Sequence, residues 1–134
     1  MTTKLIPYLM SEDARKQAGF YVQALGGEIQ SVMTFGQMPG TPEADQDKVM
    51  HLSVDVVGGL TIFMSEAHGG AVTYGRNICL SLNYDNVEAA RAAFDGLAEE
   101  GGNIQFPLQL QPWGAFYGEV LDVFGVTWMI ATQS

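Results

Sequence analysis

The feature that most constrains this sequence is an internal repeat. The string at residues 26–30, Gly-Gly-Glu-Ile-Gln, recurs 75 residues later at 101–105 as Gly-Gly-Asn-Ile-Gln. The string at 55–58, Asp-Val-Val-Gly, recurs 67 residues later at 122–125 as Asp-Val-Phe-Gly. Because the matches keep their order, they predict two tandem copies of one structural unit. The eight-residue difference between the offsets predicts a loop in the first copy alone, and residues 38–45, rich in turn formers, fit it.

One amphipathic helix is predicted in each copy. In the first copy Ser11 is the expected N-cap, the acidic residues after it suit the positive end of the helix dipole, and Gly26-Gly27 end the helix. In the second copy Asp85 or Asn86 is the expected cap, and Gly101-Gly102 the end. Apolar residues recur at helical spacing at Ala14, Ala18, Tyr21 and Leu25, and at Val87, Ala90, Phe94 and Leu97.

Eight strands are predicted around these helices from period-two or β-branched patterns. They span roughly residues 4–10, 28–35, 49–57, 60–65, 77–83, 104–110, 115–121 and 126–132. The element order is therefore βαβββ twice, an α+β fold in a single domain of 134 residues. Module one is expected at about residues 1–66, a glycine-rich linker at about 67–75, and module two at about 76–134.

Composition excludes several classes of partner. Fifteen acidic residues against six basic ones leave a net charge of −9, which repels phosphate backbones and anionic membranes. We therefore expect no nucleic-acid partner and no membrane partner. The sole cysteine, Cys79, rules out an intramolecular disulfide, and we find neither a signal peptide nor an apolar run of about 20 residues. These features predict a cytoplasmic protein.

Strand parity predicts which side chains share a concave surface, because neighbouring side chains of a strand point to opposite faces. On two of the predicted strands the apolar faces are formed by Met50, Leu52, Val54 and Val56, and by Ile78, Leu80 and Leu82. If these faces pack under the helices, the side chains left on the concave side are His51, Ser53, Cys79 and Ser81.

The same rule extends to strands that are apolar on both faces. It adds five side chains to the concave side, which are Tyr8, Phe63, Tyr117, Glu119 and Met129. Further rings are expected on the wall or rim at Trp113, Phe116 and Trp128. An apolar, aromatic cavity with few polar groups is typical of a small-molecule site. The alternative interpretation is that these side chains fill the protein's own core and that His51 is a hydrogen-bonded structural residue.

Five motifs along the chain are familiar in this order. They are Pro7-Tyr8-Leu9, then Ala18-Gly19-Phe20-Tyr21 running into Leu25-Gly26-Gly27, Val49-Met50-His51, Met64-Ser65-Glu66, and residues 122–130 with Trp128-Met129-Ile130 at their end. Together they resemble the PhnB-like branch of the glyoxalase and bleomycin-resistance superfamily, whose members are called vicinal oxygen chelate proteins. The similarity covers nearly the whole chain.

The resemblance implies paired βαβββ modules that form a cupped, half-barrel mixed sheet with the helices on its convex face. It also implies a homodimer, in some members with modules exchanged between chains. Metal-dependent members take His or Glu ligands from the first and fourth strands of each module. The matching positions here are Ile6 or Tyr8, Phe63, Cys79 and Met129, of which only Cys79 is a ligand type. The usual divalent metal site is therefore expected to be absent, and no cofactor is expected.

Three functions remain open on this evidence. The first is binding of a small apolar or aromatic molecule in the concave cleft, where rings stack on the ligand and His51, Ser53 and Glu119 orient it. The second is a metal-independent enzyme with His51 as general base and Glu119 or Cys79 assisting, because imidazole exchanges protons near neutral pH. The third, by family analogy, is a metal-dependent lyase or dioxygenase, for which His51, Cys79 and Glu119 are a non-standard ligand set.

Overall fold

The computed structural model describes residues 2–67 and 69–133, so His68 of the expected linker lies outside the described residues. The chain divides into two compact units, residues 1–72 and 73–134, called module one and module two below. Among the described residues, each module contains one α-helix and a four-stranded mixed sheet in the order βαβββ. The predicted α+β fold of two tandem modules is therefore confirmed.

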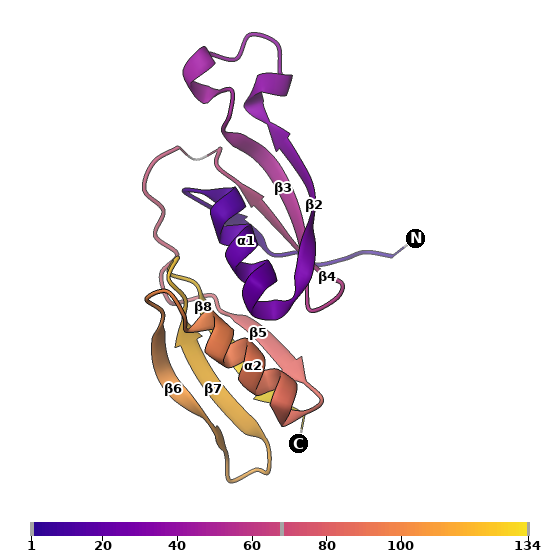
Figure 1. Cartoon of the computed structure of the whole chain (residues 1–134), viewed down its shortest axis with the longest axis vertical. Coiled ribbons are helices and arrows are strands. Elements are labelled where there is room, and N and C mark those ends of the chain that lie inside the picture. Colours follow the sequence, from indigo (N-terminus) through magenta and orange to yellow (C-terminus); the bar gives the residue numbers. More distant parts are fainter. Residues whose placement is uncertain (1, 68, 134) are drawn as a thin grey trace. The chain divides into compact units, whose positions relative to one another are not determined.

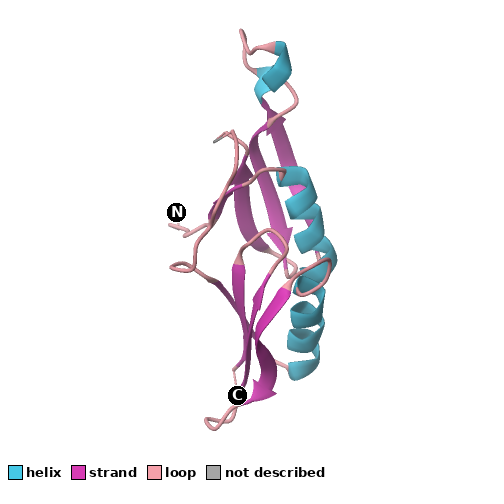
Figure 2. Cartoon of the chain, turned by 90° about the vertical axis from the view of Figure 1, so that its left-hand side faces the viewer, coloured by secondary structure: helices cyan, strands magenta, loops and turns pink. Residues whose placement is uncertain are grey.

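Module one is built from β1 (Tyr8–Met10), α1 (Ala14–Leu25), β2 (Gly27–Thr34), β3 (Val49–Val56) and β4 (Leu60–Ser65) (Figure 1). The strand order is β1-β4-β3-β2. Strand β1 runs parallel to β4, and the other neighbours are antiparallel. The helix packs on one face of this sheet, mainly against β3 and β2 (Figure 2).

Module two repeats this plan with β5 (Leu80–Tyr84), α2 (Val87–Leu97), β6 (Asn103–Leu110), β7 (Phe116–Leu121) and β8 (Thr127–Thr132). The strand order is β5-β8-β7-β6, with β5 parallel to β8. Helix α2 packs on one face of this sheet as well (Figure 2). In each module we call the sheet face opposite the helix the open face.

The helix caps differ in part from those expected. Asp13, not Ser11, caps α1, and its side chain accepts a hydrogen bond from the Lys16 amide at 3.2 Å. The Ser11 side chain is buried and donates to the Gln17 side-chain oxygen at 2.6 Å, so it serves the core instead. Asn86 caps α2, as one of the two predicted alternatives, by accepting from the Ala89 amide at 2.8 Å.

Each core lies between the helix and the alternate residues of the sheet beneath it. In module one the Leu52, Val54 and Val56 side chains are buried under α1, as predicted. In module two Trp128 is only 1% exposed, so the expectation of a Trp128 ring on the cavity wall is wrong. Its indole nitrogen donates to the Asp122 carboxylate at 2.9 Å, which fixes the ring inside the core. Ile78, expected in the buried set, is 80% exposed because β5 begins only at Leu80.

The repeat is real, but one of its two sequence matches is out of register by one residue. Ile29 pairs with Val54 and Ile104 pairs with Val120, so the first match is in register at an offset of 75. In the β-turns that follow, Gly59 donates to the Val56 carbonyl and Gly125 donates to the Asp122 carbonyl. Asp122 therefore corresponds to Val56 rather than to Asp55, and it points toward the helix while Asp55 points away.

The connection between β2 and β3 contains the loop predicted only for the first copy. It holds two short 3-10 helices, η1 (Phe35–Gln37) and η2 (Glu43–Asp45), at the end of module one in Figure 1. The Thr41 hydroxyl lies 2.6 Å from the Phe35 carbonyl oxygen and holds the two turns together. In module two the matching connection is the short segment at 111–115, so the loop prediction is confirmed.

Candidate functional site

The open face of module one carries a cluster of three rings, Tyr8, His51 and Phe63. Tyr8 pairs with Phe63 across β1 and β4, while His51 lies on β3 between the buried Leu52 and the half-buried Met50. The Tyr8 hydroxyl and His51 Nδ1 share a hydrogen bond of 3.2 Å. The imidazole packs edge-on against the Phe63 ring, with centroids 4.6 Å apart. Three strands thus hold the imidazole between two rings.

The ring cluster is only partly covered by the rest of module one. The Tyr8 side chain is 50% exposed, and His51 and Phe63 are half-buried. Ser53 pairs with Phe63, and Met33 pairs with His51, so a hydroxyl and a thioether extend the same face toward β2. Such a surface presents aromatic faces with few polar groups, the usual make-up of a small-molecule site.

The open face of module two carries a hydrogen-bonded pair, Tyr117 and Glu119. Both residues lie on β7, and the Tyr117 hydroxyl donates to Glu119 Oε2 at 2.5 Å. Burial raises the pKa of Tyr117 to about 12, helped by the hydrogen bond to Glu119, by the negative charge of Glu119 and by that of Cys79. The phenol therefore keeps its proton at neutral pH and orients the carboxylate.

A row of paired residues crosses the open face of module two at Glu119. Met129 pairs with Ser81 on one side and with Glu119 on the other, and Glu119 pairs with Phe106 on the edge strand β6. The predicted residues Ser81, Glu119 and Met129 are thus neighbours. By this register Ser81, not Cys79, is the counterpart of Tyr8, because Tyr8 pairs with Phe63 as Ser81 pairs with Met129.

Cys79 and Trp113, both predicted to bind a ligand, lie outside this row. Cys79 precedes β5 and is half-buried, close enough to Tyr117 to act on its pKa. Trp113 lies in the turn between β6 and β7 and is 68% exposed. The two open faces belong to different modules, so His51 and Ser53 are described with module one, and Cys79, Ser81 and Glu119 with module two.

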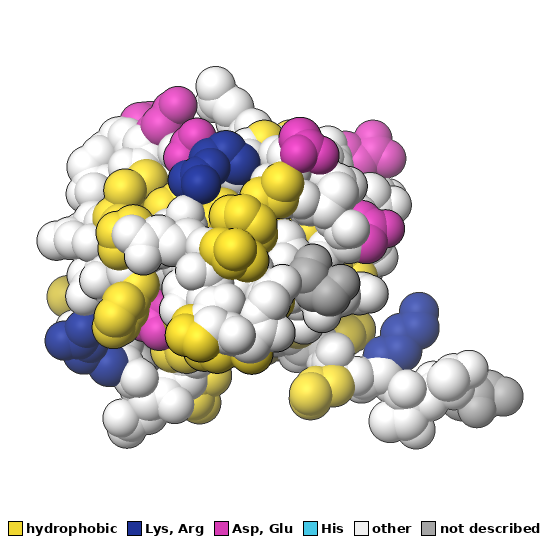
Figure 3. Space-filling view, turned by 90° about the horizontal axis from the view of Figure 1, so that it is seen from below, with side chains coloured by type: hydrophobic (Ala, Val, Ile, Leu, Met, Phe, Trp, Pro, Cys, Tyr) yellow, Lys and Arg dark blue, Asp and Glu magenta, His cyan; other side chains and the backbone are white. Residues whose placement is uncertain are grey.

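Phe106 is a candidate site residue that strand parity did not identify. It lies directly opposite Glu119, and its side chain is 59% exposed. Strand β6 has register shifts on both sides of Phe106, and such bulges change the direction in which a side chain points. Pro107, next in the chain, was the available signal that the alternation is broken there. Figure 3 shows that hydrophobic side chains reach the surface at several places on the face it draws.

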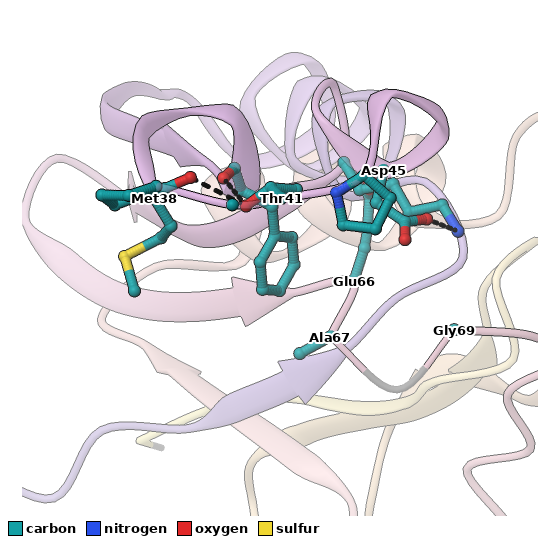
Figure 4. Close-up of a pocket in the computed structure, with 11 residues that line it drawn as sticks. Met38, Thr41, Asp45, Glu66, Ala67 and Gly69 are labelled. Carbon is teal, nitrogen blue, oxygen red and sulfur yellow. Dashed lines mark hydrogen bonds and ion pairs between the residues drawn. The ribbon is translucent and has the colours of Figure 1, made fainter.

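Module one also contains a pocket of about 570 Å³ beside the β2–β3 connection (Figure 4). Its charged groups already have partners. Lys48 and Asp45 form an ion pair of 3.0 Å, and the Glu66 carboxylate accepts from the backbone amides of Ala14 and Val49. The rest of the lining is largely apolar, with Phe35, Met38, Pro39, Pro42 and Ala67. No residue predicted from the sequence to bind a ligand lies in this pocket.

The family model of the Glyoxalase/Bleomycin resistance protein/Dioxygenase superfamily matches residues 6–130. The chain belongs to this superfamily. Among its relatives in the superfamily is Protein YjdN of Escherichia coli strain K12, with 29% identity over 94% of this chain and 92% of that protein.

Solved structures of similar proteins have the same fold. The protein PA1353 from Pseudomonas aeruginosa has 34% identity and a TM-score of 0.81, with 98% of each chain covered. A PhnB protein from Bacillus cereus has 22% identity and a TM-score of 0.78, over 97% of this chain and 99% of that one. The PhnB-like resemblance of the sequence motifs is therefore confirmed at the level of fold and superfamily.

Within residues 2–67 and 69–133, no three His, Cys, Asp or Glu side chains lie together so that they could hold a metal ion. No helix in the described part of the chain is long and apolar enough to span a membrane.

Proposed function

We propose that this superfamily member binds a small planar aromatic or apolar molecule in the concave cleft that the sequence predicts, without the divalent metal of its metal-dependent relatives. The observation that carries this proposal is the Tyr8–His51–Phe63 cluster on the open face of module one. A ring that is half exposed on a sheet is stabilised by a ligand that covers it, because water contact with aromatic surface is unfavourable.

The cluster is also fixed before a ligand arrives. The Tyr8–His51 hydrogen bond and the edge-on contact of His51 with Phe63 restrict the rotamers of all three rings. Ordering side chains on binding costs about 0.5–1.5 kcal/mol each, so a preformed set of rings favours affinity. The imidazole adds one polar group that can orient a ligand, and Ser53 adds a hydroxyl beside Phe63.

The residue types at the family's ligand positions support the proposal that the ligand binds without a divalent metal. The paired positions on the first and fourth strands hold Tyr8 and Phe63 in module one, and Ser81 and Met129 in module two. A phenyl ring offers no donor, and a thioether is a poor ligand for a hard or borderline divalent ion. With Phe63 and Met129 at two of the four positions, this set does not fit the usual site.

Binding is tested with N-phenyl-1-naphthylamine, a neutral planar dye that becomes fluorescent in apolar surroundings. We expect saturable binding, and we expect Phe63→Ala to weaken it about tenfold, the effect of losing one ring contact of about 1.4 kcal/mol. The control is Leu60→Ala, which shortens a side chain that is 52% exposed on the same strand but outside the ring cluster. Equal affinities of the two variants would exclude the cluster as the binding surface.

The location of the dye is tested by NMR of the methionine methyl groups. The Met33 methyl lies beside His51, while the Met38 methyl lines the pocket at the β2–β3 connection. We expect the dye to shift the Met33 signal at lower concentration than the Met38 signal. The reverse order would move the site from the ring cluster to that pocket.

The metal-free part of the proposal has its own test. Purified protein is analysed for bound metals by mass spectrometry, and its thermal unfolding is followed with added Zn²⁺, Ni²⁺ or Mg²⁺. We expect well under one equivalent of any metal and no rise in Tm. A Tm increase that saturates near one equivalent would favour metal-dependent lyase or dioxygenase chemistry, by the non-standard set or another.

A metal-independent enzyme with His51 as general base is the second candidate. The Tyr8 hydroxyl engages Nδ1, and Nε2 of the imidazole has no hydrogen-bond partner among the described residues. A ring held at one nitrogen and free at the other is arranged as general bases commonly are. Turnover that His51→Gln abolishes while N-phenyl-1-naphthylamine still binds would favour this candidate over binding alone.

A further inference from the structure

We infer that the open face of module two selects a planar aromatic cation, with Glu119 as its counter-ion and Phe106 and Met129 as flanking contacts. This inference goes beyond the proposed function, because it names a second site and its ligand class on module two. The ring cluster of module one carries no carboxylate, whereas the open face of module two adds the charge of Glu119 to the selection of the ligand.

The first step is that Glu119 presents a fixed carboxylate with no basic partner. Its Oε2 accepts a hydrogen bond from Tyr117, and among the described residues no Lys, Arg or His forms an ion pair with it. Because the phenol keeps its proton at neutral pH, it acts as a donor that supports the ionised carboxylate. One carboxylate oxygen is thus left to face a ligand.

The second step is that an aromatic ring and a thioether flank this carboxylate. Phe106 and Met129 are its direct cross-strand neighbours, and such neighbours have Cβ atoms about 4.5–5.5 Å apart. A flat cation placed at Glu119 therefore contacts both side chains. Ring faces attract cations through their quadrupole, and the soft sulfur of methionine makes favourable contacts with aromatic groups.

The third step is that module two carries a net negative charge. Residues 73–134 contain two basic residues, Arg76 and Arg91, against seven acidic ones. Both arginines are engaged elsewhere, Arg91 with the Leu108 carbonyl at 3.0 Å and Arg76 with the Gln105 side chain at 3.2 Å. An anion is therefore repelled from this face by the net negative charge of module two. A cation is attracted both by Glu119 and by that net charge.

The exposure of Phe106 agrees with this assignment. The Phe106 ring is 59% exposed and lies between two register shifts of an edge strand. Contact of this much aromatic surface with water is unfavourable. Bulges are over-represented at sheet edges and next to active sites, where they change the direction of a side chain. A cation stacked on this ring removes its exposed face from water.

The test uses two probes of nearly equal shape at pH 8, 1-methylquinolinium, which is always positive, and quinoline, which is neutral at that pH. We expect the cation to bind the wild-type protein about tenfold more tightly than the neutral molecule. Glu119→Gln keeps the size of the side chain and an acceptor for Tyr117. It is expected to weaken cation binding about tenfold and to leave quinoline binding unchanged.

The contribution of the ring is measured separately. Phe106→Leu keeps an apolar side chain but removes the π face, so we expect it to weaken the cation more than quinoline. Val123→Ala is the control, since it shortens a side chain that is 44% exposed in the β7–β8 turn, outside the Glu119 row. The Met129 methyl signal is expected to shift on addition of 1-methylquinolinium, in the wild type and in Val123→Ala alike.

The possible results separate the two proposals. Equal binding of the two quinoline probes, or a charge preference that survives Glu119→Gln, overturns the cation inference while N-phenyl-1-naphthylamine binding still supports the proposed function. Loss of N-phenyl-1-naphthylamine binding alone overturns the role of the module one rings and leaves the cation site standing. If none of the three probes binds folded protein, with the fold checked by circular dichroism, both proposals fail.

Discussion

At the scale of single residues, Asp122 holds the β7–β8 turn and the core of module two together. Its carboxylate is 3% exposed, and it accepts from the amides of Phe124 and Val126 and from the Trp128 indole. We expect Asp122→Asn to lower the free energy of unfolding by about 2–3 kcal/mol, because its amide NH₂ must face one of these buried donors. Urea denaturation followed by circular dichroism measures the loss.

The sequence repeat supplies a control for this prediction. Asp55 belongs to the matching string, but its side chain accepts from the Thr61 hydroxyl at 3.0 Å on the open face of module one and is only part-buried. We expect Asp55→Asn to cost less than about 1 kcal/mol. Equal losses in the two variants would contradict the one-residue difference in register between the two copies.

The ionisation of Tyr117 makes the stability of module two fall at alkaline pH. Its pKa is raised from 10.0 to about 12 in the folded protein, by burial first and then by Glu119. Between these two values the unfolded chain releases the phenolic proton and the folded chain keeps it. The contribution of Tyr117 to stability is therefore complete below pH 10 and is lost as the pH rises toward 12.

A spectrophotometric titration of phenolate formation measures this pKa, assigned by the difference from Tyr117→Phe. Glu119→Gln is expected to move the Tyr117 titration toward lower pH, because it removes the negative charge that opposes ionisation. An unchanged titration in Glu119→Gln would show that the hydrogen-bonded pair does not form.

At the scale of elements, Glu66 ties three segments of module one to one another. It follows β4, and its two carboxylate oxygens accept from the first residue of α1, Ala14, at 2.6 Å and from the first residue of β3, Val49, at 2.9 Å. We expect Glu66→Gln to destabilise the protein by about 1–3 kcal/mol, because the amide NH₂ faces one of these donors. Faster hydrogen exchange of the Ala14 amide is the direct measurement.

The N-cap of the same helix is the control for Glu66. Asp13 caps α1 through the Lys16 amide, and Asn is as good a cap as Asp. Asp13→Asn is therefore expected to change stability by only a few tenths of a kcal/mol. A larger effect of Asp13→Asn than of Glu66→Gln would mean that capping, and not the carboxylate bridge, holds the start of the helix.

The elements were predictable where one periodicity dominated. Both helices and the buried face of β3 follow from apolar spacing, and the β2–β3 loop follows from the unequal offsets of the repeat. Prediction failed where a strand is apolar on both sides, because parity then has no polar face to mark it. Trp128 is the example, since it pairs with the buried Val120 on the helix side of the sheet, where its indole nitrogen donates to Asp122.

The candidate site was predictable in its members but not in its contacts. Tyr8, His51 and Phe63 were placed on one face by parity alone, whereas their hydrogen bond and ring geometry depend on strand register. Phe106 was missed because its orientation depends on two bulges, which tertiary pairing creates. The sequence predicts Ser11 as a cap because it does not show that Gln17 draws the Ser11 hydroxyl into the core.

At the scale of the whole molecule, we propose that the chain forms a homodimer, as the family resemblance implies. Exposed apolar side chains support this proposal, above all on the edge strand β6, where Ile104 is 49% and Leu110 is 62% exposed. Exposed apolar patches commonly mark interfaces, so β6 is where we expect the contact between the two copies. Pro107 and the two register shifts disfavour added strand pairing at this edge, so we expect side chains rather than backbone to make the contact.

Sedimentation velocity over a range of concentrations tests this proposal. We expect the wild type to sediment at twice the mass of the chain, and Leu110→Lys to shift the equilibrium toward monomer by tenfold or more in Kd, because a charge is then buried against an apolar partner. Gln23→Lys adds the same charge at an exposed position of helix α1, and it is expected to leave the mass unchanged. The net charge changes equally in the two variants, so a difference between them reports on the position of the new lysine. A monomeric wild type refutes the dimer, and a dimer that tolerates Leu110→Lys moves the interface away from β6.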